Sequence, residues 1–400
     1  MAEAPRRPRV LSGMRPTGML HLGHLFLLRK WVELQETSDC SFFVADYHAL
    51  TTGVRNEREA KANSIDMLVC WLAAGLDPER STLFIQSQLR EHAELHLVLS
   101  MVCPLPWLER VPSFKDKADT AKREDLSYGL LGYPVLQAAD IIAHSADHVP
   151  VGDDQEAHVE LAARVARTFN DRFGKPDGWQ ERLAELEEQL PDAKEYRRLR
   201  QAAAQDGDAA ARGKARELVD AAELGREARQ VLRGGADGGG REILVPPAPL
   251  KAEVSRLAGL DGQAKMSKSE RNDIGMLEDR ESFAAKLKAM PTDPARVRRS
   301  DPGTPAKCPV YGYHRLFSAE EIQSQVAEGC QSAGIGCIEC KGLLADGIEA
   351  QVAPLRQRAE PWLRDRDKID AIIKQGNDRA RAHAAGVLSD VRRAVGLPQA

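Results

Sequence analysis

Residues 16–24 read Pro-Thr-Gly-Met-Leu-His-Leu-Gly-His, and this stretch decides the fold. It follows an apolar, strand-like run at Val10 and precedes a helix-like run that begins near Leu25. A loop between a strand and a helix N-terminus presents free backbone N–H groups and a partial positive charge, which suits a phosphate-bearing ligand. Two imidazoles, His21 and His24, therefore lie where a nucleotide would bind.

Residues 265–269, Lys-Met-Ser-Lys-Ser, form a second polar stretch, which has no periodicity. Lys265 and Lys268 are mobile point charges that can stabilise negative charge developing in a transition state. Each stretch alone is weak evidence, because a His pair on a helix commonly packs or faces solvent and a Lys/Ser-rich loop is commonly only solvated. Together, and in this order, the two stretches resemble the paired signatures of class I aminoacyl-tRNA synthetases, which bind ATP with Mg²⁺.

Residues 9 to about 177 alternate apolar runs with helical patterns. Strand-like runs occur at 9–12, 41–45 and 82–86, with helical stretches between them. This alternation predicts an α/β fold, a Rossmann-like doubly wound parallel sheet that binds ligands at the carboxyl ends of its strands. The loop that contains His21 follows the first strand, where this rule places a ligand.

The composition then changes twice along the chain. The middle part is rich in Ala, Glu and Arg and predicts a charged helical insertion, most simply a hairpin, which ends in a glycine-rich flexible linker at 234–240. The last part predicts a separate α-helical C-terminal domain, in which Ser318 and Glu321 have the spacing of a capping box. The predicted parts are residues 1–177 with 246–280, 178–245 and 281–400.

The bulk composition is that of a globular protein, with 400 residues, 42% apolar and 29% charged, and a net charge of −4. No apolar run reaches the ~18 residues that a membrane helix needs, and the first residues lack the apolar core of a signal peptide, so we expect a cytoplasmic protein. The net charge excludes a dominant polyanion-binding surface but not a local one. Residues 296–299, Arg-Val-Arg-Arg, are one candidate for such a patch, or a solvated loop.

Two further stretches carry a narrower resemblance. Residues 133–141, Tyr-Pro-Val-Leu-Gln-Ala-Ala-Asp-Ile, and 149–155, Val-Pro-Val-Gly-Asp-Asp-Gln, are similar to the amino-acid pocket of bacterial tryptophanyl-tRNA synthetases, as are residues 43–51. The similarity covers nearly the whole chain outside the insertion. It implies a homodimeric ligase that acts on L-tryptophan, ATP and tRNA(Trp), with an anticodon-binding C-terminal domain.

Asp140 is the residue that favours tryptophan. Indole has one N–H donor, and a buried carboxylate is a strong acceptor for it; a helix cap or an ion pair is the plainer alternative. The resemblance implies that the amino acid is held by Tyr133, Gln137, Asp140, Val149, Val151, Gln155 and His48.

The same resemblance implies the ATP site. The residues around the nucleotide would be Arg15, Pro16, Thr17, Gly18, Gly23, His24, Gly152, Asp153, Asp154, Lys265, Met266, Ser267, Lys268 and Ser269. The catalytic residues would be His21, His24, Lys265 and Lys268. Arg15 stands where many members of the family have glutamine. For Lys115 and Lys117 there are two alternatives: one of them contacts phosphate, or both face solvent.

Four of the seven cysteines cluster, at Cys308, Cys330, Cys337 and Cys340. The last two are spaced as metal ligands, and four thiolates suit zinc or a 4Fe–4S cluster equally well by ligand count. A subset of tryptophanyl-tRNA synthetases resembles this spacing and carries a 4Fe–4S cluster, which favours the cluster over Zn²⁺. The plainer alternative is four buried thiols.

Two other functions compete with a tryptophan ligase. A tyrosyl-tRNA synthetase has the same chemistry with another pocket. A synthetase-like paralogue could keep the fold and act in RNA binding or redox sensing. The intact His21/His24 and Lys265/Lys268 pairs argue against the paralogue.

Overall fold

The computed structural model describes residues 6–50, 57–112, 114–115, 127–152, 155–205, 208–251, 257–262, 266–268 and 270–399. Within these residues one sheet of five parallel strands forms the centre, in the order β3-β2-β1-β4-β5. The strands are β1 (Arg9–Met14), β2 (Asp39–Val44), β3 (Ser81–Ile85), β4 (His148–Val151) and β5 (Ala248–Lys251). The strand order reverses between β1 and β4, where a doubly wound sheet opens a crevice for ligands. The predicted fold class is confirmed.

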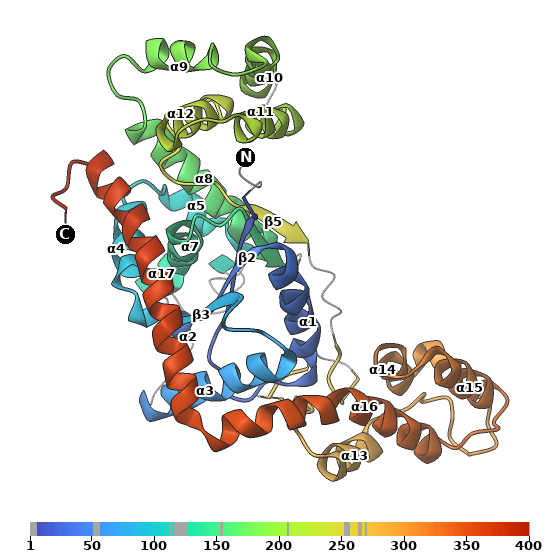
Figure 1. The fold of residues 1–400 in the computed structure, drawn as a ribbon. Coiled ribbons are helices and arrows are strands. Elements are labelled where there is room, and N and C mark those ends of the chain that lie inside the picture. Colours follow the sequence, from blue (N-terminus) through green and yellow to red (C-terminus); the bar gives the residue numbers. More distant parts are fainter. Residues whose placement is uncertain are drawn as a thin grey trace.

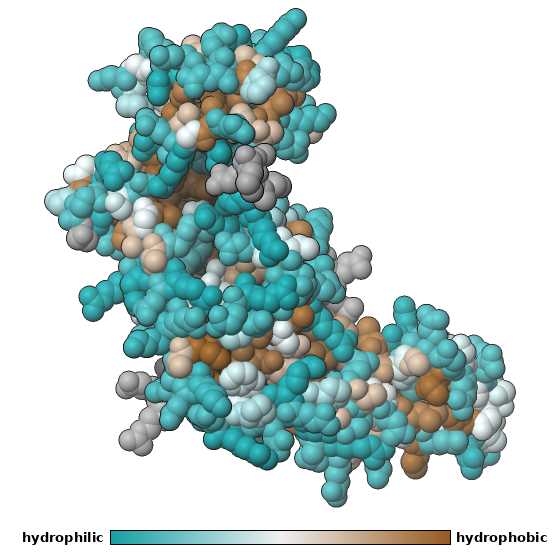
Figure 2. Space-filling model, viewed as in Figure 1, coloured by the Kyte–Doolittle hydropathy of each residue, from teal (hydrophilic) through white to brown (hydrophobic). Residues whose placement is uncertain are grey.

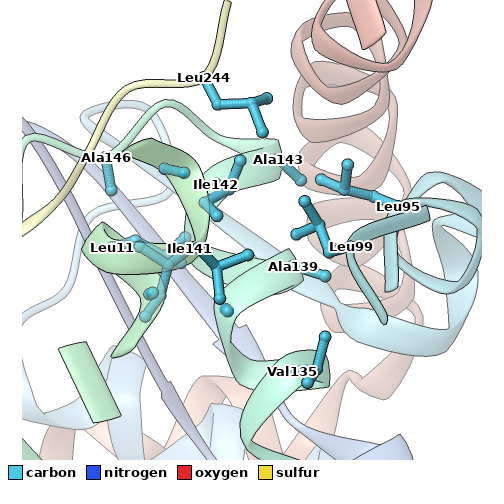
Figure 3. Packing of buried hydrophobic residues seen from close by; sticks show 14 of the residues in the cluster. Leu11, Leu95, Leu99, Val135, Ala139, Ile141, Ile142, Ala143, Ala146 and Leu244 are labelled. Atoms are coloured by element: carbon cyan, nitrogen blue, oxygen red, sulfur yellow. The ribbon is translucent and has the colours of Figure 1, made fainter. Parts of the chain in front are cut away.

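Helices cover both faces of the sheet because alternate strand residues point to opposite sides. Leu11 and Phe43 pack on one side with α4 (Arg90–Ser100), α7 (Tyr128–Ala143), α8 (Glu156–Phe173) and α17 (Arg366–Ala394). Val10 and Phe42 pack on the other side with α1 (Leu22–Thr37), α3 (Glu57–Ala74) and α16 (Cys337–Arg364). Figure 3 shows Leu11 against Ile141 and its neighbours in α7. Burying each such side chain contributes about 1.5–3 kcal/mol. The helices of the catalytic fold are α1 (Leu22–Thr37), α2 (Asp46–Leu50), α3 (Glu57–Ala74), α4 (Arg90–Ser100), α5 (Leu105–Glu109), α7 (Tyr128–Ala143) and α8 (Glu156–Phe173), with the 3-10 turn η1 (Gln86–Gln88).

The insertion is a small helical unit that projects from the catalytic fold (Figure 1). It has its own hydrophobic cluster, which includes Trp179, Tyr196 and Leu232. The prediction of a helical, charged insertion was right, but the expected hairpin was wrong, because four helices are needed to enclose this cluster. They are α9 (Trp179–Glu187), α10 (Ala193–Gln205), α11 (Ala209–Ala221) and α12 (Arg226–Ala236).

The glycine-rich run at 234–240 is not a flexible linker. Its first two glycines end α12, and a Cβ on Gly234 would lie 1.9 Å from the carbonyl oxygen of Gly240. The backbone N–H of Arg241 donates to the carbonyl of Gly174 over 2.8 Å, so the two ends of the insertion meet. Glycine is required here for close backbone packing rather than for flexibility.

The C-terminal region is helical, as expected, and its last helix returns to the sheet. The helices are α13 (Arg280–Ala289), α14 (Pro309–Phe317), α15 (Glu320–Gln331), α16 (Cys337–Arg364) and α17 (Arg366–Ala394), with the 3-10 turn η4 (Pro305–Lys307). Helix α17 runs beside β3, close enough that a Cβ on Gly376 would lie 1.8 Å from the carbonyl oxygen of Leu83. The region is therefore not separate from the catalytic core.

The predicted capping box at Ser318 and Glu321 is wrong. Ser318 follows α14, and its hydroxyl bonds to the ring of His314 over 2.8 Å. Helix α15 begins after Ala319, which offers no side-chain cap.

The part of the chain that the structure describes contains no helix long and apolar enough to span a membrane. The face in Figure 2 is largely hydrophilic, and hydrophobic residues show mainly in the recesses between the projecting parts.

Candidate active site

The site is built at the carboxyl ends of four neighbouring strands. The loop with His21 follows β1, the helix with His48 follows β2, Gln86 follows β3, and Gly152 follows β4. Parallel strands bring their carboxyl ends to one edge of the sheet, so these segments meet there.

His21 is the N-cap of α1, and His24 is the third residue of that helix. The ring of His21 accepts from the backbone N–H of Gly23 over 3.1 Å, and the backbone N–H of His21 donates to His24 Nδ1 over 3.4 Å. The two rings lie 3.9 Å apart between centroids. The pair thus caps the helix as a reciprocal capping box and orients its N-terminus toward the site.

Backbone pairing brings the lysine-containing loop to the same place. Leu22 N–H donates to Ile274 carbonyl over 2.9 Å, and Met276 N–H donates to Leu20 carbonyl over 2.7 Å. These two hydrogen bonds fix the chain where it leaves the lysine-containing loop. In addition, Lys268 Nζ donates to the carbonyl of Thr17 over 2.6 Å. The two stretches that are far apart in sequence are therefore in contact.

The remaining residues predicted around ATP fall into two groups. Pro16, Gly18, Met266 and Ser267 are wholly or partly buried, whereas Arg15 and Thr17 are exposed. Gly18 has φ +77°, a left-handed conformation that favours glycine, and a Cβ there would lie 2.8 Å from Asn63 Oδ1. Lys115 is exposed. Asp153, Asp154, Lys265, Ser269 and Lys117 lie outside the described residues.

Asp140 is the centre of a buried polar cluster. Its carboxylate is fully buried in α7, and Gln86 Nε2 lies 2.8 Å from both oxygens. His48 Nε2 lies 3.0 Å from Oδ2, and His92 Nδ1 lies 2.7 Å from Oδ1. Burial acts to raise the pKa of Asp140, but the hydrogen bonds from His48 and His92 outweigh it and lower the pKa to about 2. The carboxylate is therefore ionised.

The other residues predicted to hold the amino acid lie around this cluster. Tyr133 is about two helical turns before Asp140 on α7, and its hydroxyl bonds to His158 Nε2 over 2.8 Å. Gln137 and Gln155 are partly buried. Val149 is buried in the core that contains α7, and Val151 packs against that core.

Gln86, His92 and His144 were not predicted from the sequence. Gln86 follows a strand directly, so the rule about carboxyl ends of strands could have found it. His92 and His144 carry no such signal, because they reach the cluster from the first turn of α4 and from the end of α7.

The four clustered cysteines lie in the lobe formed by η4 and α14–α16, and all are partly buried. Burial and the charges of Cys308, Cys330 and Cys337 raise the pKa of Cys340 to about 12. Their thiols are thus near one another. Among the described residues, however, no three His, Cys, Asp or Glu side chains are arranged as they stand to hold a metal ion.

The chain belongs to the family described as tRNA synthetases class I (W and Y), which matches residues 3–190 and 221–352. Within it, the chain is similar to tryptophan–tRNA ligases. That of Ralstonia nicotianae is 48% identical over 394 residues, 97% of this chain and 98% of the relative, and that of Thermotoga maritima is 38% identical over 393 residues, 97% and 99% of the two chains. The structure of Campylobacter jejuni tryptophanyl-tRNA synthetase complexed with ADP and tryptophan matches with a TM-score of 0.72 and 28% identity, covering 97% of this chain and all of that one.

Proposed function

We propose that this chain is a tryptophan–tRNA ligase, which activates L-tryptophan with ATP and transfers it to tRNA(Trp). The full-length similarity to ligases of this name supports the activity. The observation that carries the choice of amino acid is the ionised Asp140 carboxylate, which is buried at the sheet edge where the predicted loops meet. The structure of the relative from C. jejuni is of a complex with ADP and tryptophan.

Tryptophan would reach Asp140 from the side of His48. Of the three side chains that contact the carboxylate, Gln86 and His92 are fully buried, and His48 alone is slightly exposed, at 9%. An indole N–H that approaches from the side of His48 would donate to the same carboxylate as Gln86, His48 and His92. Phenylalanine has no such N–H, so it would fill the pocket without giving the buried Asp140 carboxylate a further partner, and the pocket would reject it for this reason. Tyr133, Gln137 and Gln155 would hold the amino-acid backbone, and Val149 and Val151 the ring.

ATP would lie over the N-terminus of α1. The backbone around Thr17, Gly18 and Gly23 would receive the nucleotide, together with the loop after β4. The tryptophan carboxylate attacks the α-phosphorus, and pyrophosphate leaves. His21, His24 and Lys268, with Lys265, would stabilise the charge on the departing phosphates, so catalysis consists of positioning and electrostatics. Mg²⁺ arrives bound to ATP and adds positive charge to the same phosphates.

In the second step a 2′-hydroxyl of the terminal tRNA adenosine attacks the carbonyl carbon of the adenylate, and AMP leaves. We assign residues 1–177 and 246–280 to catalysis, 178–245 to the insertion and 281–400 to anticodon binding. The basic residues of 296–299 lie in the last part and are exposed or partly exposed, which suits a phosphate backbone.

We also propose a homodimer, formed through α4, α5 and the start of α7. Leu97, Met101, Leu105 and Tyr128 are between 54% and 70% exposed there, an unusual concentration of large apolar side chains. Sedimentation of the wild-type protein and of Met101→Lys tests this. A wild-type monomer at micromolar concentration would contradict it.

For the four cysteines we propose a 4Fe–4S cluster rather than Zn²⁺. Four cysteine ligands suit a 4Fe–4S cluster, and the four thiols lie in one lobe and affect one another electrostatically. Two further contacts favour sulfur ligands: Arg296 donates to Cys330 Sγ over 3.7 Å, and His314 Nε2 lies 3.4 Å from Cys340 Sγ. Binding requires the thiols to turn toward a common centre. When bound, the group would cross-link this lobe.

Exchange of labelled pyrophosphate into ATP tests the main proposal. Tryptophan should support exchange, and tyrosine and phenylalanine should not. Exchange with tyrosine alone would instead identify a tyrosyl enzyme, and no exchange with any amino acid would favour a non-catalytic paralogue. Charging of tRNA(Trp) checks the second step.

A further inference from the structure

A second imidazole lies behind Asp140, on the side away from the crevice. His92 Nδ1 contacts Asp140 Oδ1 over 2.7 Å, and His92 Nε2 contacts His144 Nε2 over 2.9 Å. His92 is fully buried and His144 is 5% exposed. The carboxylate and the two rings form a continuous chain of hydrogen bonds inside the protein.

The protons of this chain can be assigned from its partners. An ionised carboxylate only accepts hydrogen bonds, so His92 Nδ1 carries the proton that lies toward Asp140. In the neutral form of His92 that carries this proton, Nε2 has only a lone pair, so the contact at 2.9 Å requires His144 Nε2 to donate. Burial holds the pKa of His144 well below its usual value, so that ring is neutral and has one N–H to give.

His144 is supported from its far side. Its ring lies 4.8 Å from that of Phe84 and stacks on His383 at 6.2 Å and 18°. It also lines a cavity of about 130 Å³ at the amino ends of β1–β3. His383 in turn bonds to the hydroxyl of Ser145 over 3.3 Å, so it supports His144 by stacking and does not reach His92.

We propose that His144 is a positioning residue for tryptophan selection, acting through His92 on Asp140. By donating to His92 Nε2, His144 excludes the His92 tautomer that would direct a lone pair at the carboxylate. Without this donor, the buried Nε2 lone pair of His92 has no partner, which weakens the preference for the tautomer that donates to Asp140 and loosens a bond that holds the carboxylate in place. The proposal rests on the proposed role of Asp140 in binding indole.

The first test reads the tautomer directly. Side-chain ¹⁵N NMR of the full-length protein, without ligand, should show His92 as the Nδ1–H tautomer. His144→Phe keeps an aromatic ring but removes the N–H that donates to His92. It should shift the ¹⁵N signals of His92 toward those of a mixture of its two tautomers. His144→Gln retains an amide N–H at similar reach and should restore them. His383→Phe, the same change one ring further away, is the matched control and should leave them unchanged.

The second test measures selection. In pyrophosphate exchange, His144→Phe should raise the KM for tryptophan about tenfold, the loss expected for one hydrogen bond in a charged network. The kcat and the KM for ATP should stay near wild type. His144→Gln and His383→Phe should both have a KM for tryptophan close to that of the wild type.

The outcomes separate this inference from the proposed function. An Nε2–H tautomer of His92 in the wild-type protein overturns the relay, whichever amino acid the enzyme selects. An unchanged tryptophan KM in His144→Phe, while Asp140→Asn is impaired, overturns the positioning role and leaves the function intact. If His144→Phe fails to fold, His144→Gln decides. A KM for tryptophan near that of the wild type supports the relay, and a KM raised about tenfold overturns it.

Discussion

Replacing Asp140 by Asn removes the negative charge on which Gln86, His48 and His92 converge. The Asn side chain has only one acceptor oxygen, and its NH₂ group would face groups that are themselves hydrogen-bond donors. A hydrogen bond to a charged group contributes about 1.5–3 kcal/mol, so losing the bond to the indole should raise the KM for tryptophan roughly 10- to 140-fold. The KM for ATP should change little, because we propose that the nucleotide binds over α1, away from Asp140.

The assay is tryptophan-dependent pyrophosphate exchange at several amino-acid concentrations, with melting temperature as a check on folding. Asp147→Asn is the matched control, since Asp147 is held by Arg6 and by the backbone of Arg9 outside the pocket. An unchanged tryptophan KM in a folded Asp140→Asn protein would refute the assignment. An equal loss for tryptophan and ATP would mean that the cluster supports the whole fold.

Four further predictions follow from the same geometry. Lys268→Ala should lower kcat for adenylate formation by about 10²–10³ and leave tryptophan binding, measured by calorimetry, nearly unchanged, because its charge acts on the departing phosphates. Deleting residues 178–240 and joining the ends by a short Gly/Ser loop should leave exchange activity intact, since Arg241 already contacts Gly174; an unfolded product by circular dichroism would contradict this. Purified anaerobically, the protein should be brown and contain iron and sulfide, and Cys337→Ser should weaken tRNA charging more than exchange; a colourless protein with tightly bound zinc would exclude the cluster. Burial, aided by Arg9, lowers the pKa of His383 from 6.5 to about 4, so the unfolded chain binds a proton that the folded one does not. Stability in urea should therefore fall between pH 6.5 and 4, and His383→Phe should reduce this fall.

Local signals predicted the sheet and both nucleotide loops. The first three strands lie within two residues of the predicted runs, because buried parallel strands are short and continuously apolar, whereas β4 and β5 were not predicted. The loop at 16–24 was placed correctly because strand, loop and helix follow one another directly. Its contact with Lys268 depends on pairing between residues far apart in the chain, and only the family resemblance suggested it.

Of the partners of Asp140, His48 was in the predicted amino-acid site and Gln86 could have been found directly after its strand, but His92 carries no local signal because it reaches the cluster from α4. The errors elsewhere have a similar cause. The glycines at 234–240 suggest flexibility when read locally, but close contact with Gly174 requires them. Helix α16 continues through Pro354 and Pro361, since its packing against α3, α13 and α14 outweighs the local cost of a proline inside a helix.

Helix α16 is also a mechanical lever. It has 28 residues, which makes it about 42 Å long. Its far end is fixed to the catalytic fold, where Arg358 donates to the carbonyl of Ala73 over 2.6 Å, while its first residue, Cys337, belongs to the cysteine lobe. A tilt of about 5° at the fixed end moves the lobe by about 4 Å over that length. A small change of tilt beside the sheet would therefore displace the cysteine lobe by several ångströms.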